Sequence, residues 1–385
     1  MPILRTISLH HPVKLVCGCG ATDQCAVDVA SSGFRRALLM TASATPAHRD
    51  ALASKLREQG SDVVFCSEID RGPTLSMFEE LLCAITSIAP DVIIGLGGGS
   101  VLDVAKLVAS LLNAPQGIRD VFGINFLRGR TTHLVCVPTT SGTGSEVSPN
   151  AILLDEDEHS KKGVISPWLV PDGTYIDPQL MVTMPPSVTA GTAMDALTHC
   201  IEAYGNKFAH PMVDLYALEG VRLIARNLPR VMDHPHDLEG REQMAIASLY
   251  GGLCLGPVNT AAVHALSYPL GSVFHLPHGL SNAILLPHVL KFNLTAAPER
   301  YATIALAMGV EPGADSLETA SRGIVAIRKL ADECGIVTRL SELHVSETTL
   351  LPMAESAMKG ARLLKNNPRE LTLDDALAIY RNSYA

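Results

Sequence analysis

Two patterns of hydrophobic residues alternate along the first half of the chain. Short apolar runs rich in β-branched residues predict buried strands at residues 13–16, 37–40, 62–65, 92–96 and 134–137. Apolar residues at helical spacing predict helices over 22–31, 45–59, 74–88 and 101–112. Strands that alternate with helices through short loops indicate a parallel sheet with helices on both faces.

The pattern changes after Asp177-Pro178. From Pro185 onward, long amphipathic or wholly apolar helical stretches continue to the C-terminus. Ser187 is expected to cap a helix that runs to about Tyr204, and Gly205 is expected to end it. The predicted fold class is therefore α/β plus all-α, with an α/β domain over 1–182 and an all-helical domain over 183–385.

Composition excludes several function classes. The 385 residues include 30 Lys and Arg against 39 Asp and Glu, a net charge of −9 that argues against nucleic-acid and anionic-membrane partners. The nine cysteines contain no CxxC pair, which favours buried free thiols in a reducing compartment. The N-terminus lacks a signal-peptide core, and the uncharged stretch 243–263 is too polar to span a membrane. We expect a cytoplasmic protein.

Two loops are typical of nucleotide binding. Gly97, Gly98 and Gly99 follow a buried strand, and a helix is predicted to begin near Ser100. Glycines let the backbone approach a ligand closely, and a helix N-terminus offers free N–H groups to a diphosphate. The second loop, residues 138–146, carries five hydroxyls that suit a ribose or phosphate. The alternatives are a tight turn without a ligand and a solvent loop.

A metal-binding pattern lies in the helical half. Asp195 and His199 are four residues apart in an apolar segment, so both project from one face of a buried helix. A divalent cation would compensate the buried carboxylate, and His264 and His278 follow in later apolar segments. One carboxylate and three imidazoles suit Fe(II) or Zn(II). The alternative is that each histidine is an ordinary hydrogen-bonded residue.

Together these blocks resemble the iron-containing (group III) alcohol dehydrogenase family over nearly the whole chain. The motifs are GGGS-x-x-D-x-AK at 97–106, PTT-x-GTGSE at 138–146, MDA-x-x-H-x-x-E at 194–202, and the segment from His264 to His288. The resemblance implies an N-terminal Rossmann-like domain, a C-terminal helical domain and a catalytic cleft between them. It also implies that Asp195, His199, His264 and His278 ligate the metal.

The resemblance further implies a set of cofactor-binding residues, namely Gly97, Gly98, Gly99, Ser100, Asp103, Thr139, Thr140, Thr143, Asn150 and Lys162. For Lys162 a surface position competes with this role, since it follows the charged stretch 155–161.

Two positions depart from the family pattern. Many members have an aspartate after the second strand that accepts the ribose hydroxyls, and this chain has Ala42 there. We therefore expect little discrimination between NAD and NADP; the alternative is that another acidic residue, such as Asp70, reaches the ribose from a different loop. Family alcohol dehydrogenases often carry a proton-relay histidine four residues after the third ligand, and here that residue is Tyr268. Tyr268, His275 and a chain of waters are therefore the candidates for moving the proton.

The resemblance implies a metal-dependent NAD(P) oxidoreductase that interconverts a small alcohol and its aldehyde or ketone by hydride transfer. The expected cofactors are Fe(II), with Zn(II) as the alternative, and NAD or NADP; the expected assembly is a homodimer or larger homo-oligomer. A maleylacetate reductase would need Arg or Lys in the pocket, whereas the segment 249–263 is uncharged. A dehydroquinate synthase-like lyase would need a basic pocket as well, and no Lys/Arg cluster accompanies the predicted ligands.

Overall fold

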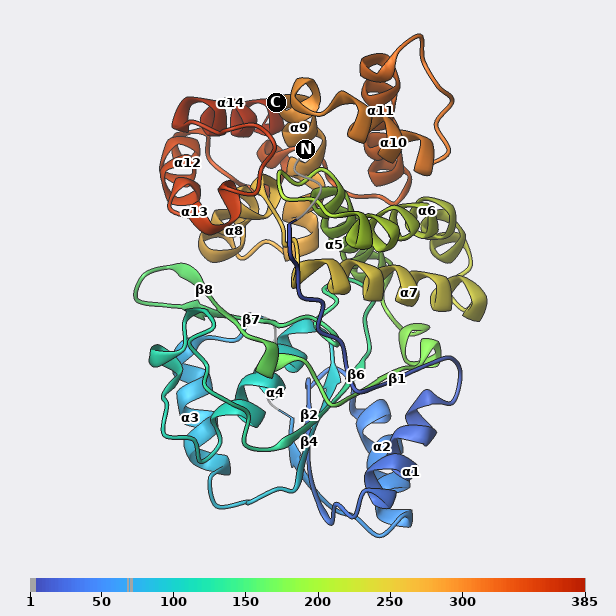
Figure 1. Cartoon of the computed structure of the whole chain (residues 1–385), viewed down its shortest axis with the longest axis vertical. Coiled ribbons are helices and arrows are strands. Elements are labelled where there is room, and N and C mark those ends of the chain that lie inside the picture. Colours follow the sequence, from blue (N-terminus) through green and yellow to red (C-terminus); the bar gives the residue numbers. More distant parts are fainter. Residues whose placement is uncertain (1–4, 68, 70–71, 385) are drawn as a thin grey trace. The chain divides into compact units, whose positions relative to one another are not determined.

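The computed structural model describes residues 5–67, 69 and 72–384. The chain divides into two compact units (Figure 1). One unit holds residues 10–140 and 144–183, and the other holds residues 184–385 together with the described part of the segment that ends at Leu9 and with Ser141–Thr143.

The α/β unit is built on a six-stranded parallel sheet. Its strand order is β1-β9-β6-β4-β2-β3. The strands are β1 (Lys14–Cys17), β2 (Arg36–Thr41), β3 (Asp62–Cys66), β4 (Val92–Gly97), β6 (His133–Pro138) and β9 (Gly173–Ile176). The helices are α1 (Ala21–Ser31), α2 (Pro46–Glu58), α3 (Leu75–Ile85) and α4 (Gly99–Leu111).

Alternate residues of the strands face opposite helix layers. In β2 and β4, Leu39 and Ile94 pack in one apolar cluster with α1 and α2. Their neighbours Leu38 and Ile93 pack in another cluster with α3 and α4. This two-residue period buries both faces of the sheet and confirms the predicted architecture.

A small second sheet is absent from the predicted elements. Its order is β5-β8-β7, and it consists of β5 (Gly123–Ile124), β7 (Asn150–Asp155) and β8 (Ser160–Ile165). Strands β7 and β8 form an antiparallel hairpin in which Lys161 pairs with Leu154 and Lys162 with Leu153. Charged residues on a half-exposed strand conceal the apolar alternation, and β5 and β9 are too short to show a period.

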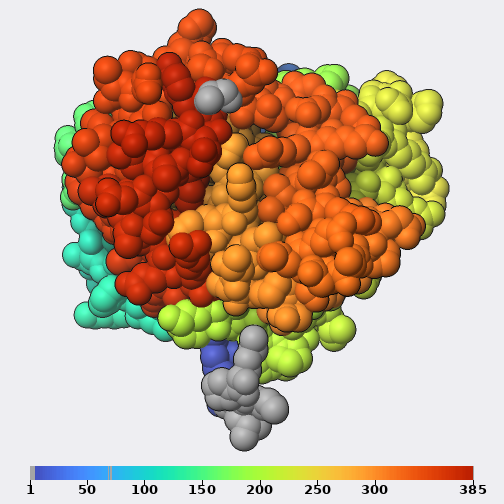
Figure 2. Space-filling model, turned by 90° about the horizontal axis from the view of Figure 1, so that it is seen from above, coloured from blue at the N-terminus to red at the C-terminus, as the bar shows by residue number. Residues whose placement is uncertain are grey.

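The other unit is helical, as predicted. Its helices are α5 (Pro186–Tyr204), α6 (Pro211–Asp233), α7 (Leu238–Leu255), α8 (Ala262–Phe274), α9 (His278–Asn293), α10 (Pro298–Ala307), α11 (Ser316–Glu333), α12 (Leu350–Met358), α13 (Ala361–Leu364) and α14 (Leu373–Tyr384). One apolar core runs through them, and Figure 2 shows the later helices, coloured orange to red, covering one face.

The structure corrects the expected cap of helix α5 and bears on the expectations about disulfides and membrane spans. Helix α5 begins at Pro186 with no side-chain cap, so Ser187 lies inside the first turn and does not cap it, whereas Gly205 ends the helix as predicted. The nine cysteines form no disulfide. Within the described ranges, no helix is long and apolar enough to cross a membrane.

Helices α5 and α9 meet at a pair of glycines. A Cβ atom at Gly279 would lie 1.9 Å from the backbone oxygen of Gly191, whereas a Cβ at Gly191 would meet only the Leu280 nitrogen, at 3.9 Å. The two backbones therefore touch at the second residue of α9. The contact fixes the start of α9 against α5.

This asymmetry yields a prediction for stability. Gly279→Ala should lower the free energy of unfolding by about 1–3 kcal/mol or more, because a backbone oxygen cannot move aside as a side chain can. Gly191→Ala is the matched control and should be neutral or stabilising, since alanine favours a helix interior by up to about 1 kcal/mol over glycine. Urea unfolding of both variants measures the difference, and equal stabilities would contradict the close approach.

Candidate active site

Three histidine side chains from three helices converge on one carboxylate oxygen of Asp195. Asp195 and His199 lie one turn apart on α5, His264 lies on α8 and His278 begins α9. The Asp195 Oδ1 atom is 3.7 Å from His199 Nε2, 3.6 Å from His264 Nε2 and 3.5 Å from His278 Nε2. In Asp195, His199 and His264, the potential ligand atoms all lie within 4.8 Å of one another.

The geometry and chemistry of this cluster fit a divalent cation. The separations exceed a hydrogen bond and approach the roughly 3.4 Å expected between ligand atoms around a tetrahedral ion with bonds of about 2.1 Å. Asp195 is 2% exposed, and in the described part of the chain no Lys or Arg forms an ion pair with it. A buried carboxylate needs compensation, and nitrogen and oxygen donors of this kind suit Fe(II) or Zn(II).

Charge coupling shapes the protonation of the cluster. Burial alone would raise the pKa of Asp195, but the facing imidazoles outweigh it and hold that pKa far below its usual range. Burial lowers the pKa of His199 to about 4, although Asp195 opposes the shift. Asp195 is thus an anion and His199 a neutral imidazole at pH 7, the forms that bind a cation.

Glu202 orients His264 from behind. Its Oε2 accepts hydrogen bonds from His264 Nδ1 at 2.6 Å and from the Ala261 N–H at 2.9 Å, and its Oε1 accepts one from the Val263 N–H at 2.6 Å. Burial would lower the pKa of His264, but Glu202 and Asp195 raise it to about 9. With Nδ1 engaged by Glu202, Nε2 of His264 faces the cluster.

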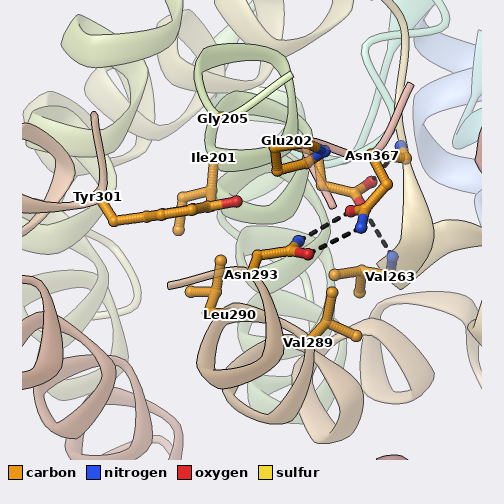
Figure 3. A pocket seen from close by; sticks show the side chains of 11 residues that line it. Ile201, Glu202, Gly205, Val263, Val289, Leu290, Asn293, Tyr301 and Asn367 are labelled. Carbon is orange, nitrogen blue, oxygen red and sulfur yellow. Dashed lines mark hydrogen bonds between the residues drawn. The ribbon is translucent and has the colours of Figure 1, made fainter. Parts of the chain in front are cut away.

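A small pocket lined by apolar and a few polar side chains lies beside Glu202 (Figure 3). Asn293 and Asn367 exchange two side-chain hydrogen bonds across it, at 2.8 and 2.7 Å. Burial raises the pKa of Tyr301, which also lines the pocket, so its hydroxyl stays protonated. The other side chains that line this pocket are apolar or neutral polar groups, so none of them forms an ion pair that would compete with His264 for Glu202.

Asn282 and Glu202 are the members of this site whose roles sequence reasoning missed. Asn282 lies one turn after His278 on α9, and its Nδ2 donates to Asp195 Oδ1 at 2.8 Å. For Glu202 the available signal was its spacing, since residues 195, 199 and 202 share one face of α5. For Asn282 the signal was its position four residues after His278.

The two proposed proton-transfer residues differ in placement. The half-buried Tyr268 ring has its centroid 6.1 Å from that of His278. Burial raises the pKa of Tyr268, while the charge and hydrogen bond of Arg362 lower it, and the net shift is upward. His275 is exposed and ends α8 with a left-handed φ of 55°. Tyr268 thus lies next to a cluster histidine, and His275 remains a prediction.

The predicted phosphate loop joins β4 to α4. Gly97 ends β4, Gly98 is the N-cap of α4, and Gly99 and Ser100 form its first turn. A Cβ atom at Gly97 would lie 2.6 Å from Val101, and one at Gly98 would lie 3.3 Å from Thr140 Oγ1. The Thr139 N–H also donates to the Gly97 oxygen at 3.0 Å, so the two predicted loops are neighbours.

A buried lysine links these loops to the hairpin. Lys106 is fully buried, and its Nζ donates to Ser145 Oγ at 2.9 Å, Ser148 Oγ at 3.3 Å and the Asn150 backbone oxygen at 2.6 Å. Asp103 accepts from the Ile152 N–H at 2.9 Å and from Ser145 Oγ. Lys106 belongs to the family motif at 97–106, but the resemblance implied no role for it.

The remaining predicted cofactor residues are spread over both units. Asn150 begins β7, and its Oδ1 is buried without a hydrogen-bond partner. Lys162 lies on β8 and pairs with Glu158. Thr143 belongs to the short segment that packs with the helical unit. Ala42 follows β2, and Asp70 lies outside the described residues.

Comparison with known proteins identifies the family. The sequence profile of "Iron-containing alcohol dehydrogenase" matches residues 12–178, and that of "Fe-containing alcohol dehydrogenase family, C-terminal" matches residues 189–384. The chain belongs to the iron-containing alcohol dehydrogenase family. It is an oxidoreductase that interconverts alcohols and aldehydes, as the resemblance implied.

Relatives of this alcohol dehydrogenase cover nearly the whole chain. It is 36% identical to 1,3-propanediol dehydrogenase of Klebsiella pneumoniae, over 91% of this chain and 92% of that one. It is 32% identical to NAD-dependent methanol dehydrogenase of Bacillus methanolicus, over 97% and 98%. A solved 1,3-propanediol oxidoreductase superposes with a TM-score of 0.95 at 34% identity, covering 99% of this chain and all of that one. The fold class agrees with that solved structure, and the family relationship implies a metal ion and NAD(H).

The Glu202 contacts yield a prediction. Glu202→Gln should weaken metal binding by roughly 10- to 100-fold, the usual effect of removing an outer hydrogen-bond partner of a ligand. The glutamine amide would turn N–H groups toward donors that now face a carboxylate, so thermal stability should fall as well. Chelator competition and thermal unfolding measure the two effects. Glu219→Gln, at a half-exposed position of α6 that pairs with Arg222, is the control. Equal metal affinity in both variants would argue against the orienting role.

Proposed function

We propose that Asp195, His199, His264 and His278 together hold one divalent metal ion, Fe(II) in the first place and Zn(II) as the alternative. The observation that carries this proposal is the approach of three imidazole Nε2 atoms to Asp195 Oδ1 at 3.5–3.7 Å. A bound ion of this kind supplies Lewis acidity, which makes an alcohol easier to deprotonate and a carbonyl easier to reduce.

The surrounding residues would set up that chemistry. Glu202 fixes the His264 ring so that Nε2 faces the cluster, and Asn282 donates to Asp195. The side chain of His278 is 29% exposed, whereas those of Asp195, His199 and His264 are 3–6% exposed. Substrate would therefore approach from the His278 side and pass Tyr268. A phenol whose pKa is raised stays protonated at pH 7, which suits a hydrogen-bond donor better than a proton acceptor.

The α/β unit would bind the dinucleotide through the two neighbouring loops. The N-terminus of α4, at Gly98, Gly99 and Ser100, would receive the diphosphate, because unpaired N–H groups and the helix dipole favour an anion there. Thr139, Thr140, Thr143, Asn150 and Lys162 would line the rest of the groove. The unpartnered Asn150 Oδ1 supports a ligand contact, whereas Asp103, bonded to Ser145 and Ile152, would shape the loop.

We further propose NAD or NADP as the hydride carrier, a short-chain alcohol or aldehyde as substrate, and a homodimer or larger assembly. The family relationship supports these points. Several relatives are named for small substrates, namely propanediol, methanol and lactaldehyde, whereas another is named a long-chain-alcohol dehydrogenase.

A reciprocal pair of variants tests the two halves of the proposal. His264→Ala should lose bound metal and turnover together while it keeps its affinity for NAD. Gly98→Val should keep the metal and lose roughly tenfold or more in NAD affinity, since its side chain would press on Thr140 and the phosphate loop. Metal analysis and calorimetric titration of NAD measure both quantities. A His264→Ala protein with full metal content and activity would refute the ligand assignment, and normal NAD affinity in Gly98→Val would refute the loop assignment.

The residue that follows β2 bears on the choice between NAD and NADP. Ala42 neither bonds ribose hydroxyls nor repels a 2′-phosphate, and the neighbouring Thr41, Ser43 and Thr45 are neutral. We expect both cofactors to be used, with kcat/KM values within roughly a hundredfold, or about 2.7 kcal/mol. Steady-state kinetics with NADH and NADPH and one good aldehyde decide this. A preference for NADH beyond about a thousandfold would mean that another residue reads the ribose.

A further inference from the structure

Arg362 brings a positive charge to the His278 side of the cluster. It is the second residue of α13, and this short helix contacts α8, which carries His264 and Tyr268. The two segments are close, because a Cβ atom at Gly360 would lie 3.6 Å from the Cβ of Ala265. The Arg362 side chain forms a hydrogen bond with the Tyr268 hydroxyl. The guanidinium thus lies next to the tyrosine that borders His278.

The charge of Arg362 has no acidic partner. Its side chain is half-exposed, and no carboxylate in the described part of the chain lies within ion-pair distance of it. Other half-buried arginines do have one, as Arg300 has Asp214 at 2.6 Å. The nearby Asp195 and Glu202 carboxylates are directed at the histidines, and the proposed divalent ion would balance their two charges. The guanidinium charge therefore remains uncompensated beside the open side of the site.

A guanidinium in such a place suits an anionic ligand group. Its planar fork matches a carboxylate or a sulfonate with two parallel hydrogen bonds. A reacting carbonyl at the cluster would have the Tyr268 ring beside it, with its centroid 6.1 Å from that of His278, and Arg362 beyond the hydroxyl. The uncharged segment 249–263 favoured a neutral alcohol, but Arg362 lies almost a hundred residues after it and reaches the site only through the fold.

We propose that Arg362 binds the anionic end of the substrate, so that the preferred substrate is a short aldehyde, or the matching alcohol, with a carboxylate or sulfonate at its far end. This proposal rests on the proposed function and names its substrate class. In the reductive direction, the carbonyl carbon takes a hydride from NAD(P)H and the oxygen takes a proton from solvent. The products are the hydroxy acid and NAD(P)⁺, and the acid group is unchanged.

The test compares three aldehydes on the metal-loaded full-length enzyme. 4-Oxobutanoate carries a carboxylate, 3-oxopropane-1-sulfonate carries a sulfonate on the same chain, and methyl 4-oxobutanoate masks the charge. We expect kcat/KM to favour the better of the two anions over the ester by about 10- to 100-fold, the range of one charge-assisted hydrogen bond. The better anion identifies the acid group. Arg362→Gln should remove the preference, mainly through KM.

Two controls separate a specific contact from a general effect of charge. Lys359→Gln removes an exposed positive charge three residues away and should keep the preference for the anion. With the unmodified enzyme, KM for the anion should rise with ionic strength while KM for the ester stays level, a readout that does not depend on the folding of a variant.

The outcomes distinguish this proposal from the function it rests on. Equal kcat/KM for the ester and both anions, or an unchanged ratio in Arg362→Gln, overturns the role of Arg362 and leaves the alcohol dehydrogenase assignment standing. A metal-loaded enzyme that reduces none of the three aldehydes with NADH or NADPH overturns the proposed function, and this proposal with it.

Discussion

The negative charge of Asp195 constrains the helical unit more than any other feature. A carboxylate at 2% exposure would be prohibitively costly without a compensating charge, and this one faces three imidazoles and the Asn282 amide. Among the residues that the structure describes, no Lys or Arg forms an ion pair with it. These partners come from α5, α8 and α9, so the three helices must meet with little tolerance. The Gly191–Gly279 contact provides that approach, because it brings the first turn of α9 onto α5 without intervening side chains.

The α/β unit buries a positive charge, the ammonium group of Lys106, and must compensate it. Lys106 is fully buried, and three oxygens from Ser145, Ser148 and Asn150 accept its hydrogen bonds, with Asp103 nearby at 3.9 Å. Burial lowers the pKa of Lys106, while Asp103 opposes the shift. Because the lysine extends from α4 to the threonine-rich loop and to β7, the same ammonium group orders the segments that we expect to contact the dinucleotide.

The strands and helices that the sequence predicts are those with a clear apolar periodicity over a short window. Strands β2, β3, β4 and β6 and helices α1 to α5 each follow a periodicity that a short window of sequence displays. The hairpin β7–β8 was not predicted, because the charged stretch 155–162 interrupts the apolar pattern. For the site, the pair Asp195–His199 is visible as a four-residue spacing, and the family motifs supplied His264 and His278. The contact from Glu202 to His264 spans 62 residues, and the contact from Arg362 to Tyr268 joins α13 to α8. Contacts of that range depend on helix packing, which no local pattern encodes.

The identity of the residue at position 268 bears on what Arg362 can do. A carboxylate there would neutralise the guanidinium, and a second imidazole beside it would have its own protonation suppressed by the neighbouring positive charge. A tyrosine does neither, because a phenol whose pKa is raised by burial accepts a hydrogen bond from Arg362 and remains uncharged. The tyrosine therefore orients the guanidinium without neutralising its charge. The tyrosine at position 268, in place of the family's histidine, and Arg362 thus act together. They keep a fixed positive charge next to the His278 side of the site, where it is available to a ligand.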